Sequence, residues 1–353
     1  MAVPTPVRFE QNPLITPADV KPSRPGLEVM CAFNAGATLL PDGRTALLVR
    51  VAERPVPRDG FVSTAFMDPG QPGRLKELHV RKDDPGLVAT DPRFFTWEGV
   101  FYLTSVSHLR LAVSKDGRRF EISDTPALSP AAPHEAYGCE DPRITRLDDG
   151  WYYVNYSAIA PSGVTTCLAR TKDFAGFERM GILFAPDNKD IALFPEKVGG
   201  SYACFHRPST KQIGAPSIWL AFSDNLADWG RHRLVIEPRA GCWDSERVGC
   251  GAAPIRTERG WLEFYHGADE NVRYCSGALL LDLEQPWKVI ARCKEPLMEP
   301  EAPPEMTGLL PGVIFNNGLV ERPDGSVDLF YGAADTTTCV ANVKIADVLE
   351  WLR

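Results

Sequence analysis

The sequence lacks the features that mark several large classes of protein. No apolar run approaches the roughly 18 residues that a membrane-spanning helix needs, and residues 1–17 have neither the basic nor the apolar segment of a secretory signal. The net charge is −8 and no stripe of Lys and Arg is present, which argues against a nucleic-acid partner. We therefore expect a cytoplasmic protein with neither a membrane nor a nucleic-acid partner. Whether it forms a homo-oligomer is left open.

The motifs of common catalytic and metal sites are missing as well. The chain has no GxSxG, no Walker A loop, no HExxH and no dinucleotide fingerprint placed between a strand and a helix. Its nine cysteines are an odd number and include no CxxC pair, so we expect buried, reduced thiols and no zinc ligands. The sequence predicts no metal site and no resident cofactor.

What the chain does contain is a long series of short strand-like segments. They are rich in aromatic and β-branched residues and are separated by turns, to which the evenly spread 31 Pro and 29 Gly contribute. Only residues 342–353 favour a helix, because Ile345, Val348, Leu349 and Leu352 fall on one helical face. The pattern predicts an all-β chain with a short C-terminal helix. The strand-like segments are 46–52, 99–106, 109–114, 151–159, 201–207, 217–223, 261–267, 276–283 and 327–335.

These segments repeat as a unit that starts from a short extended stretch, which we call an anchor. Anchors recur at about 50 to 65 residues, close to the length of one four-stranded propeller blade. The six anchors are FNAGA (33–37), TDPRF (90–94), CEDPRI (139–144), LFPEK (193–197), GCGAAP (249–254) and FNNG (315–318). We predict a single five-bladed β-propeller over residues 1–353, in which 85–106 add an extra hairpin to the first blade. Innermost strands line the channel of a propeller, so polar residues of the anchors are expected at one axial site.

The third anchor contains a candidate catalytic acid. Glu140, Asp141 and Arg143 surround Pro142, which stiffens the backbone beside Asp141. A catalytic carboxyl group must be fixed and partly desolvated to hold a proton at neutral pH. The alternative is a turn closed by an Asp–Arg ion pair. The second anchor has Asp91 and Arg93 in the same arrangement, so the motif alone does not decide between the two.

A group of basic residues falls at the ends of strands in successive repeats. Converging Arg, Lys and His donors suit a compact oxyanion such as phosphate. The alternative is a set of scattered surface cations with snorkelling stems. The candidate phosphate-binding residues are Arg50, Lys189, Lys197, His206 and Arg207.

A third group combines aromatic rings with carboxylate and amide groups. Sugar sites have this composition, because a pyranose ring has an apolar CH face and a polar rim. Each aromatic residue taken singly is equally typical of a β-protein core. Asp335 is less easily assigned to the core, since it follows the small residues 332–334 and a buried carboxylate needs a partner. The group consists of Tyr265, His266, Asp269, Tyr274, Phe315, Asn316 and Asp335.

Seven motifs in this order resemble glycoside hydrolase family 130, the mannoside phosphorylases and related β-mannosidases. They are CEDPRIT, NKDIALFPEK, FHRP, WDSERVG, GWLEFYHG, LLDLEQPWKVIAR and FYGAADT, and the likeness runs from about residue 12 to the GAADT strand. The resemblance implies a five-bladed β-propeller that cleaves a β-mannosidic bond with inorganic phosphate, releasing α-mannose 1-phosphate with inversion. A small oligosaccharide would then be the substrate and phosphate the co-substrate. The linkage position and the acceptor sugar are not predicted.

The resemblance also implies roles for individual residues. Asp141 falls on the family's acid, which passes its proton through the 3-hydroxyl of the mannosyl unit. The implied mannosyl-binding residues are Asn34, Tyr274, Phe315 and Asp335. His206 would lie between sugar and phosphate, and Arg50, Lys197, Lys189 and Arg207 would hold phosphate.

Two rival functions remain at this stage. A β-mannosidase of the same family would need a second carboxylate to activate water, and Glu196, Glu246 and Glu263 lie near the relevant motifs. A non-catalytic carbohydrate-binding propeller would keep the aromatic residues but would need neither an acid nor phosphate ligands.

Overall fold

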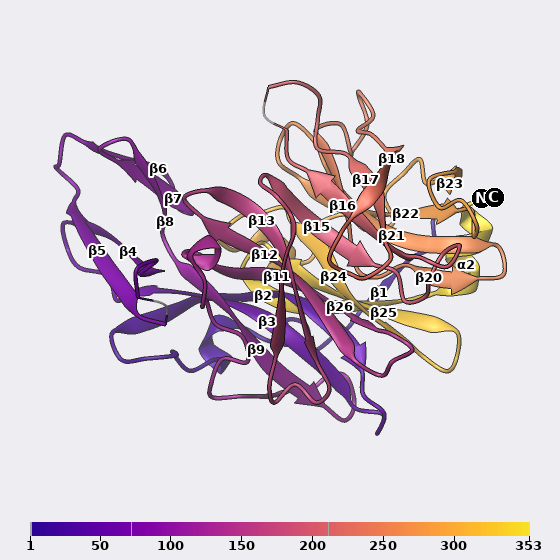
Figure 1. The fold of residues 1–353 in the computed structure, drawn as a ribbon, viewed down its shortest axis with the longest axis horizontal. Coiled ribbons are helices and arrows are strands. Elements are labelled where there is room, and N and C mark those ends of the chain that lie inside the picture. Colours follow the sequence, from indigo (N-terminus) through magenta and orange to yellow (C-terminus); the bar gives the residue numbers. More distant parts are fainter. Residues whose placement is uncertain (1, 72, 211) are drawn as a thin grey trace.

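The computed structural model describes residues 2–71, 73–210 and 212–353, and its fold is all-β. Helical structure in these residues is limited to four short elements: η1 (Pro17–Asp19), η2 (Pro133–Glu135), α1 (Pro303–Met306) and α2 (Ile345–Trp351). None of the helices in the described residues is long and apolar enough to cross a membrane. Figure 1 shows the strands following one another through the molecule, with the two chain ends on the same side.

The largest sheet has eight strands in two halves. The first half consists of β2 (Leu27–Leu39), β3 (Thr45–Pro55), β9 (Val106–Ser114) and β10 (Glu121–Ile122). The second half consists of β11 (Gly138–Arg146), β12 (Tyr152–Ala160), β13 (Gly163–Thr171) and β14 (Glu178–Phe184). Strands within each half are antiparallel, and the halves meet at a single parallel pair, Ser107 with Gly138.

Three further antiparallel sheets follow along the chain. The first consists of β15 (Asn188–Leu193), β16 (Tyr202–Pro208), β17 (Ile218–Ser223) and β18 (Gly230–Ile236). The next consists of β19 (Arg247–Cys250), β20 (Ile255–Thr257), β21 (Gly260–Ala268), β22 (Tyr274–Leu281) and β23 (Val289–Arg292). The last consists of β24 (Ile314–Glu321), β25 (Ser326–Ala333), β26 (Thr337–Lys344) and β1 (Val7–Arg8), so the N-terminal strand completes the C-terminal sheet.

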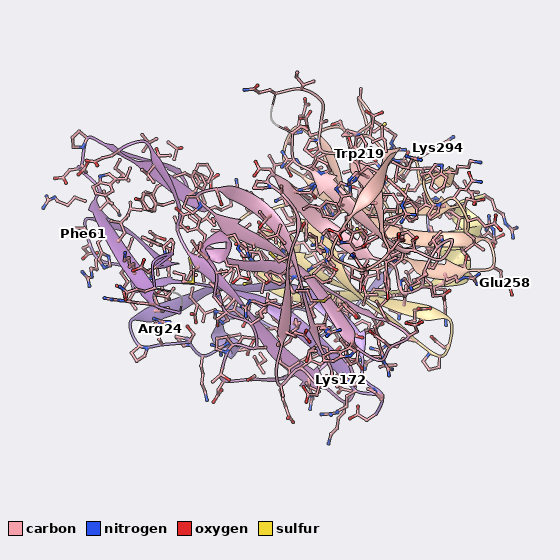
Figure 2. The ribbon with its side chains drawn as sticks, viewed as in Figure 1. Arg24, Phe61, Lys172, Trp219, Glu258 and Lys294 are labelled. Carbon is pink, nitrogen blue, oxygen red and sulfur yellow. The ribbon has the colours of Figure 1, made fainter. Side chains whose placement is uncertain are left out.

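Two small sheets lie between β3 and β9, and together we call them the cap. They are the hairpin β4 (Phe61–Met67) and β5 (Leu75–Arg81) and the three strands β6 (Leu87–Asp91), β7 (Phe94–Trp97) and β8 (Val100–Leu103). The cap extends to one side of the main body in Figure 1, and Figure 2 shows Phe61 of β4 at that edge. The segment expected to form an extra hairpin, 85–106, therefore holds three strands and is only part of a longer insertion.

The first strands of successive groups carry the same irregularity. A β-bulge interrupts β2 after Phe33, β11 after Glu140 and β15 after Lys189. Asn34, Asp141 and Asp190 occupy these bulges with φ of 47°, 49° and 53°. Asn and Asp tolerate this left-handed conformation better than other residues with side chains. The bulges re-aim three polar side chains out of their strands, as bulges near active sites commonly do.

Buried polar contacts join these first strands to one another. The Asn317 amide of β24 donates to the carbonyls of Asn34 (2.6 Å) and Pro142 (3.0 Å). Arg143 of β11 donates to the carbonyls of Cys250 and Gly251, each at 3.0 Å. Each such bond contributes about 1 kcal/mol net, but leaving a buried partner unpaired costs about 1–3 kcal/mol. These hydrogen bonds therefore hold together strands that are far apart in sequence, and those strands carry the site.

Three strand groups share a second repeated feature, a buried acid held by a tyrosine and an arginine. The acid precedes the group, the tyrosine lies on a middle strand, and the arginine lies on the outermost strand. The sets are Glu135 with Tyr156 and Arg179, Asp244 with Tyr265 and Arg292, and Glu305 with Tyr331 and Arg8. The three groups are thus built on one plan.

Some expectations about local structure were wrong. The last helix begins at Ile345 and not at residue 342, because 342–344 pair with 326–328 as part of β26. TDPRF forms the turn between β6 and β7 in the cap, and the first strand β15 precedes most of LFPEK. All nine cysteines are free, but Cys242 is exposed while the other eight are buried.

Candidate functional site

A cavity of about 400 Å³ opens between the first strands and the cap. Its volume lies within the range of sites for small molecules. Eight of the sequence-predicted site residues line it: Asn34, Arg50, Asp141, Lys189, Arg207, Tyr274, Phe315 and Asp335. They come from four of the six sheets or from the turns beside them. The fold thus brings together residues that are up to 301 positions apart.

Asp141 is the most firmly held carboxylate in the cavity. Asn34 Nδ2 donates to its Oδ1 at 2.8 Å, and Arg50 Nη1 donates to the same oxygen at 3.0 Å. Arg50 Nη2 also donates to Glu140 Oε1 at 2.6 Å, so one guanidinium joins two neighbouring carboxylates. Gly332 allows Asn34 this close approach, since a Cβ there would lie 1.8 Å from Asn34 Oδ1. Only one oxygen of Asp141 is engaged in these contacts, and the carboxylate can still act on a ligand.

The two adjacent carboxylates differ in their affinity for protons. Burial raises the pKa of Glu140, and the Arg50 guanidinium only partly offsets this. Burial also acts to raise the pKa of Asp141, but Arg50, Arg143 and the Asn34 amide outweigh it and leave that pKa below its usual value. Neighbouring carboxylates commonly divide a proton unequally. A proton shared by this pair is therefore held more tightly by Glu140 than by Asp141.

The cations on the other wall are anchored by Asp190. This fully buried carboxylate lies 3.0 Å from Arg207 Nη1 and 3.2 Å from His266 Nε2. Burial would raise the pKa of Asp190, but Arg207, His266 and Arg143 outweigh it and hold that pKa well below its usual value. Burial lowers the pKa of His266 to about 4, so its ring is neutral near pH 7. Asp190 thereby fixes Arg207 with its charge directed at the cavity beside Lys189.

Aromatic rings form another part of the lining. The rings of Phe315 and His266 lie 4.3 Å apart, and Tyr274 lies 6.4 Å from Phe315. Arg247 Nη1 donates to the Tyr274 hydroxyl at 3.1 Å, which orients that side chain at the cavity. His266 itself is fully buried behind Phe315 and does not line the cavity. Such a wall offers both an apolar face and hydroxyl-binding groups.

Two residues predicted to hold phosphate lie elsewhere. Lys197 is exposed, and its ammonium group sits 4.4 Å from the centre of the Tyr202 ring, outside the cavity. His206 is buried, stacks on Phe184 at 4.3 Å and lies 3.2 Å from His232. Burial lowers the pKa of His206 to about 3, so it carries no positive charge near neutral pH. The geometry offers neither residue to an anion in the cavity.

The three glutamates considered as bases for water also lie outside the cavity lining. Glu196 is paired with Arg256 on the surface at 3.4 Å, and Glu246 is exposed. Glu263 is buried, accepts a bond from the Gly251 N–H at 2.9 Å, and has a pKa raised well above its usual value by burial. A buried carboxyl group with a raised pKa, outside the cavity lining, is not placed to act as a base on water in the cavity.

The sequence-based reasoning missed three contributors to the site. Asp190 was passed over although it sits in the NKD motif beside Lys189, because its role depends on the bulge that turns it inward. Arg247 and Arg93 line the cavity as well. Arg247 follows the WDSE motif, and Arg93 lies in TDPRF, for which the sequence left a structural turn and a functional role open. In the residues that the structure describes, no group of His, Cys, Asp or Glu could hold a metal ion.

Asp335 has a raised pKa, which makes the stability of the protein depend on pH. Burial raises its pKa to about 6, against the opposing charge of Arg50. In the unfolded chain an aspartate titrates near pH 3.9, so the folded state binds the extra proton between about pH 4 and pH 6. The protonated Asp335 carboxyl group therefore contributes to the free energy of unfolding below about pH 4, and this contribution is lost as the pH rises to about 6 and above.

We expect Asp335→Asn, which stays neutral at every pH, to melt at the wild-type temperature near pH 4 and above it at pH 8. Thermal unfolding of both proteins across this pH range measures the difference. A difference in melting temperature that does not change with pH would contradict the assigned protonation.

Comparison with known proteins gives consistent matches. The sequence profile of a family described as beta-1,4-mannooligosaccharide phosphorylase matches residues 100–353. The chain is 44% identical over 349 residues to the beta-1,2-mannobiose phosphorylase of Listeria innocua, covering 98% of each. It is 43% identical over 246 residues to a 1,2-beta-oligomannan phosphorylase of Thermoanaerobacter, covering 69% of this chain and 80% of that one. The Listeria enzyme's structure with beta-1,2-mannobiose superposes with a TM-score of 0.94 at 42% identity, covering 98% of this chain and 99% of that one.

Proposed function

The chain belongs to glycoside hydrolase family 130, and we propose that it cleaves a β-mannosidic bond with inorganic phosphate as the attacking group. The products are α-mannose 1-phosphate and the shortened sugar. The observation that carries this proposal is the composition of one cavity, in which Asp141 shares the lining with the cations Arg50, Lys189 and Arg207. Phosphate brings its own negative charge, so the reaction needs one carboxyl acid and no carboxylate base. Each cation also offers charge-assisted hydrogen bonds to phosphate oxygens.

In this proposal Asp141 is the acid, and inversion places phosphate on the face of the sugar opposite the leaving oxygen. Lys189 and Arg207 bind phosphate, and Arg50 holds Asp141 and Glu140 in place while adding positive charge. Asn34, Tyr274, Phe315 and Asp335 bind the mannosyl ring. Lys197 and His206 have no direct part, and His266 acts through Asp190 and Phe315.

We also propose that the five groups of strands are the blades of one five-bladed propeller forming a single catalytic domain. The pairing of β1 with β26 would close the last blade with the start of the chain. Contacts of β2 with β11 and β24, and of β15 with β11 and β19, support a circular order. A cytoplasmic location remains a prediction from the sequence, which leaves the oligomeric state open.

The first substrate to test is β-1,2-mannobiose, since the Listeria and Thermoanaerobacter relatives act by name on β-1,2-linked mannosides. Purified protein is incubated with this disaccharide, with and without phosphate, and α-mannose 1-phosphate and mannose are quantified. We expect α-mannose 1-phosphate and mannose in equal amounts, and no cleavage without phosphate. Equal rates of mannose release with and without phosphate would overturn phosphorolysis in favour of hydrolysis. Binding of the sugar without turnover would favour a carbohydrate-binding protein.

A further inference from the structure

The cap is an insertion between two strands, β3 and β9, that pair with each other without its help. β3 and β9, the strands on either side of the insertion, pair directly over nine residues, from Thr45 with Ser114 to Glu53 with Val106. The cap is therefore an addition to the body that carries Asp141 and the phosphate-binding cations.

The cap is nevertheless fixed to the segment that leads into Asp141. The Tyr137 hydroxyl donates to the carbonyl of Phe101 at 2.6 Å, and the Met67 N–H donates to the carbonyl of Ala136 at 2.7 Å. The rings of Phe66 and Tyr137 pack edge to face at 6.2 Å. β11, with Asp141, starts at the very next residue, Gly138. These contacts hold the cap at a defined distance from the acid.

The cap brings one charged and two aromatic side chains to the cavity: Arg93, Phe94 and Phe101 all line it. The two phenylalanine rings lie 5.1 Å apart, and Phe101 is 43% exposed. A large apolar side chain left exposed at the edge of a cavity signals a contact surface. Pyranose rings offer an apolar face of the size that such a pair can cover.

Arg93 is held in a fixed orientation beside these rings. Its Nε and Nη2 donate to the two oxygens of Asp91, at 3.0 and 2.8 Å, which locks the plane of the guanidinium. In the described part of the chain, its Nη1 donates to no side chain or carbonyl oxygen. This nitrogen has two N–H groups that can bind ligand hydroxyls. Together with the hydrogen bonds to Asp91, the negative charge of Asp335 contributes to raising the pKa of Arg93. Arg93 therefore lies near Asp335, at the mannosyl end of the cavity.

We infer that the cap is the acceptor wall of the site: Arg93 hydrogen-bonds hydroxyls of the sugar released by phosphorolysis, and Phe94 and Phe101 cover its apolar face. This inference rests on the proposed function. The family description and the Listeria enzyme's name share a mannosyl unit and differ in its linkage. Because the cap lines the cavity but carries neither Asp141 nor the phosphate-binding cations, it is suited to contact the part of the substrate in which these enzymes differ. Phosphate, by contrast, is bound from β15 and β16, which carry Lys189 and Arg207.

The test is synthesis in the reverse direction, from α-mannose 1-phosphate and mannose, followed as phosphate release. We expect Arg93→Ala to raise the KM for mannose about tenfold, as the loss of one charge-assisted hydrogen bond does. The KM for α-mannose 1-phosphate should stay within twofold. An unchanged KM for mannose, or an equal rise in both, would overturn the acceptor role.

Arg81→Ala is the matched control. Arg81 also lies in the cap and holds an aspartate two residues away through Nε and Nη2, both at 2.8 Å to Asp83. It does not line the cavity. Both KM values should remain at wild-type levels in this variant. If Arg81→Ala raised the KM for mannose as much as Arg93→Ala, a general effect on the cap would replace the inference.

Binding measurements separate this inference from phosphorolysis itself. Calorimetry with β-1,2-mannobiose needs no turnover, and Arg93→Ala should weaken binding about tenfold while the affinity for α-mannose 1-phosphate is kept. This result in a protein without phosphate-dependent turnover would refute phosphorolysis and leave the acceptor wall standing. Equal mannobiose affinity in wild type and variant, or no binding to either, would refute the acceptor wall.

Discussion

Asp141→Asn is expected to release α-mannose 1-phosphate about 1,000-fold more slowly than the wild type, within the range of losses for a catalytic acid. The substitution removes the proton donor and the negative charge that faces Arg50, and it keeps the shape of the side chain. An asparagine Oδ1 can still accept the bonds that Asn34 and Arg50 give to Asp141 Oδ1. Because the polar contacts are kept, the loss should appear in kcat, with folding and sugar binding near the wild-type level.

The measurement is initial rate at saturating β-1,2-mannobiose and phosphate, together with calorimetric affinity for the disaccharide. Asp42→Asn is a suitable control, since Asp42 is an exposed aspartate paired with Arg44. It should keep the full rate. A rate for Asp141→Asn within tenfold of wild type would refute the role of acid. Lost affinity with an unchanged rate at saturation would make Asp141 a binding residue only.

The pKa values of the carboxyl groups in the cavity place a condition on this mechanism, because Asp141 must carry a proton before it can act as the acid. The pKa of Asp141 is held below its usual value, whereas burial raises that of Glu140 and raises that of Asp335 to about 6. An acid without its proton cannot donate one. A phosphate anion beside Lys189 and Arg207 offsets the positive charge that keeps Asp141 ionised, and an added negative charge raises the pKa of nearby carboxyl groups. Phosphate binding would thus prepare the acid as well as supply the nucleophile.

Much of this site follows from the order of short motifs along the chain. Polar residues at the start of strand groups identified Asn34 and Asp141, the small residues 332–334 pointed to Asp335, and all three line one cavity. The prediction was less accurate where the position of a bulge decides the outcome. LFPEK was taken as the anchor of its repeat, yet the bulge lies at Asp190, and Lys197 accordingly falls outside the cavity. A shift of a few residues in extended chain changes which side chains point inward.

The two DPR motifs show a second limit of local reasoning. Asp91 and Arg93 form a direct pair, with Nη2 at 2.8 Å from the carboxylate. Arg143 instead donates to the carbonyl oxygen of Asp141 and to partners from other sheets, including Asp190 at 3.4 Å. The same three letters therefore close a turn in the cap, whereas in the body Arg143 leaves the Asp141 carboxylate to Asn34 and Arg50. The difference depends on contacts between Arg143 and residues about 50 to 110 positions further along the chain, and a local sequence pattern holds no information about such contacts.

The strongest test of the phosphate site compares Lys189 with Lys197. The sequence predicted that both lysines bind phosphate, but only Lys189 lines the cavity. In the described residues Lys189 and Arg247 form no salt bridge, and Arg247 is engaged by the Tyr274 hydroxyl, whereas Arg50, Arg93 and Arg207 each already contact a carboxylate. An uncompensated cation in a cavity is the one that gains most from an anion, and a charge-assisted hydrogen bond contributes about 1.5–3 kcal/mol.

Lys189→Met should therefore raise the KM for phosphate about 10- to 100-fold, in initial rates at saturating β-1,2-mannobiose, without lowering the melting temperature. Lys197→Met removes the same charge from the surface beside Tyr202 and controls for any long-range effect of net charge. Its KM for phosphate should match the wild type. If the two variants behaved alike, or if Lys197→Met were the more impaired, phosphate would have to bind outside this cavity. The assignment of Lys189 and Arg207 would then be abandoned.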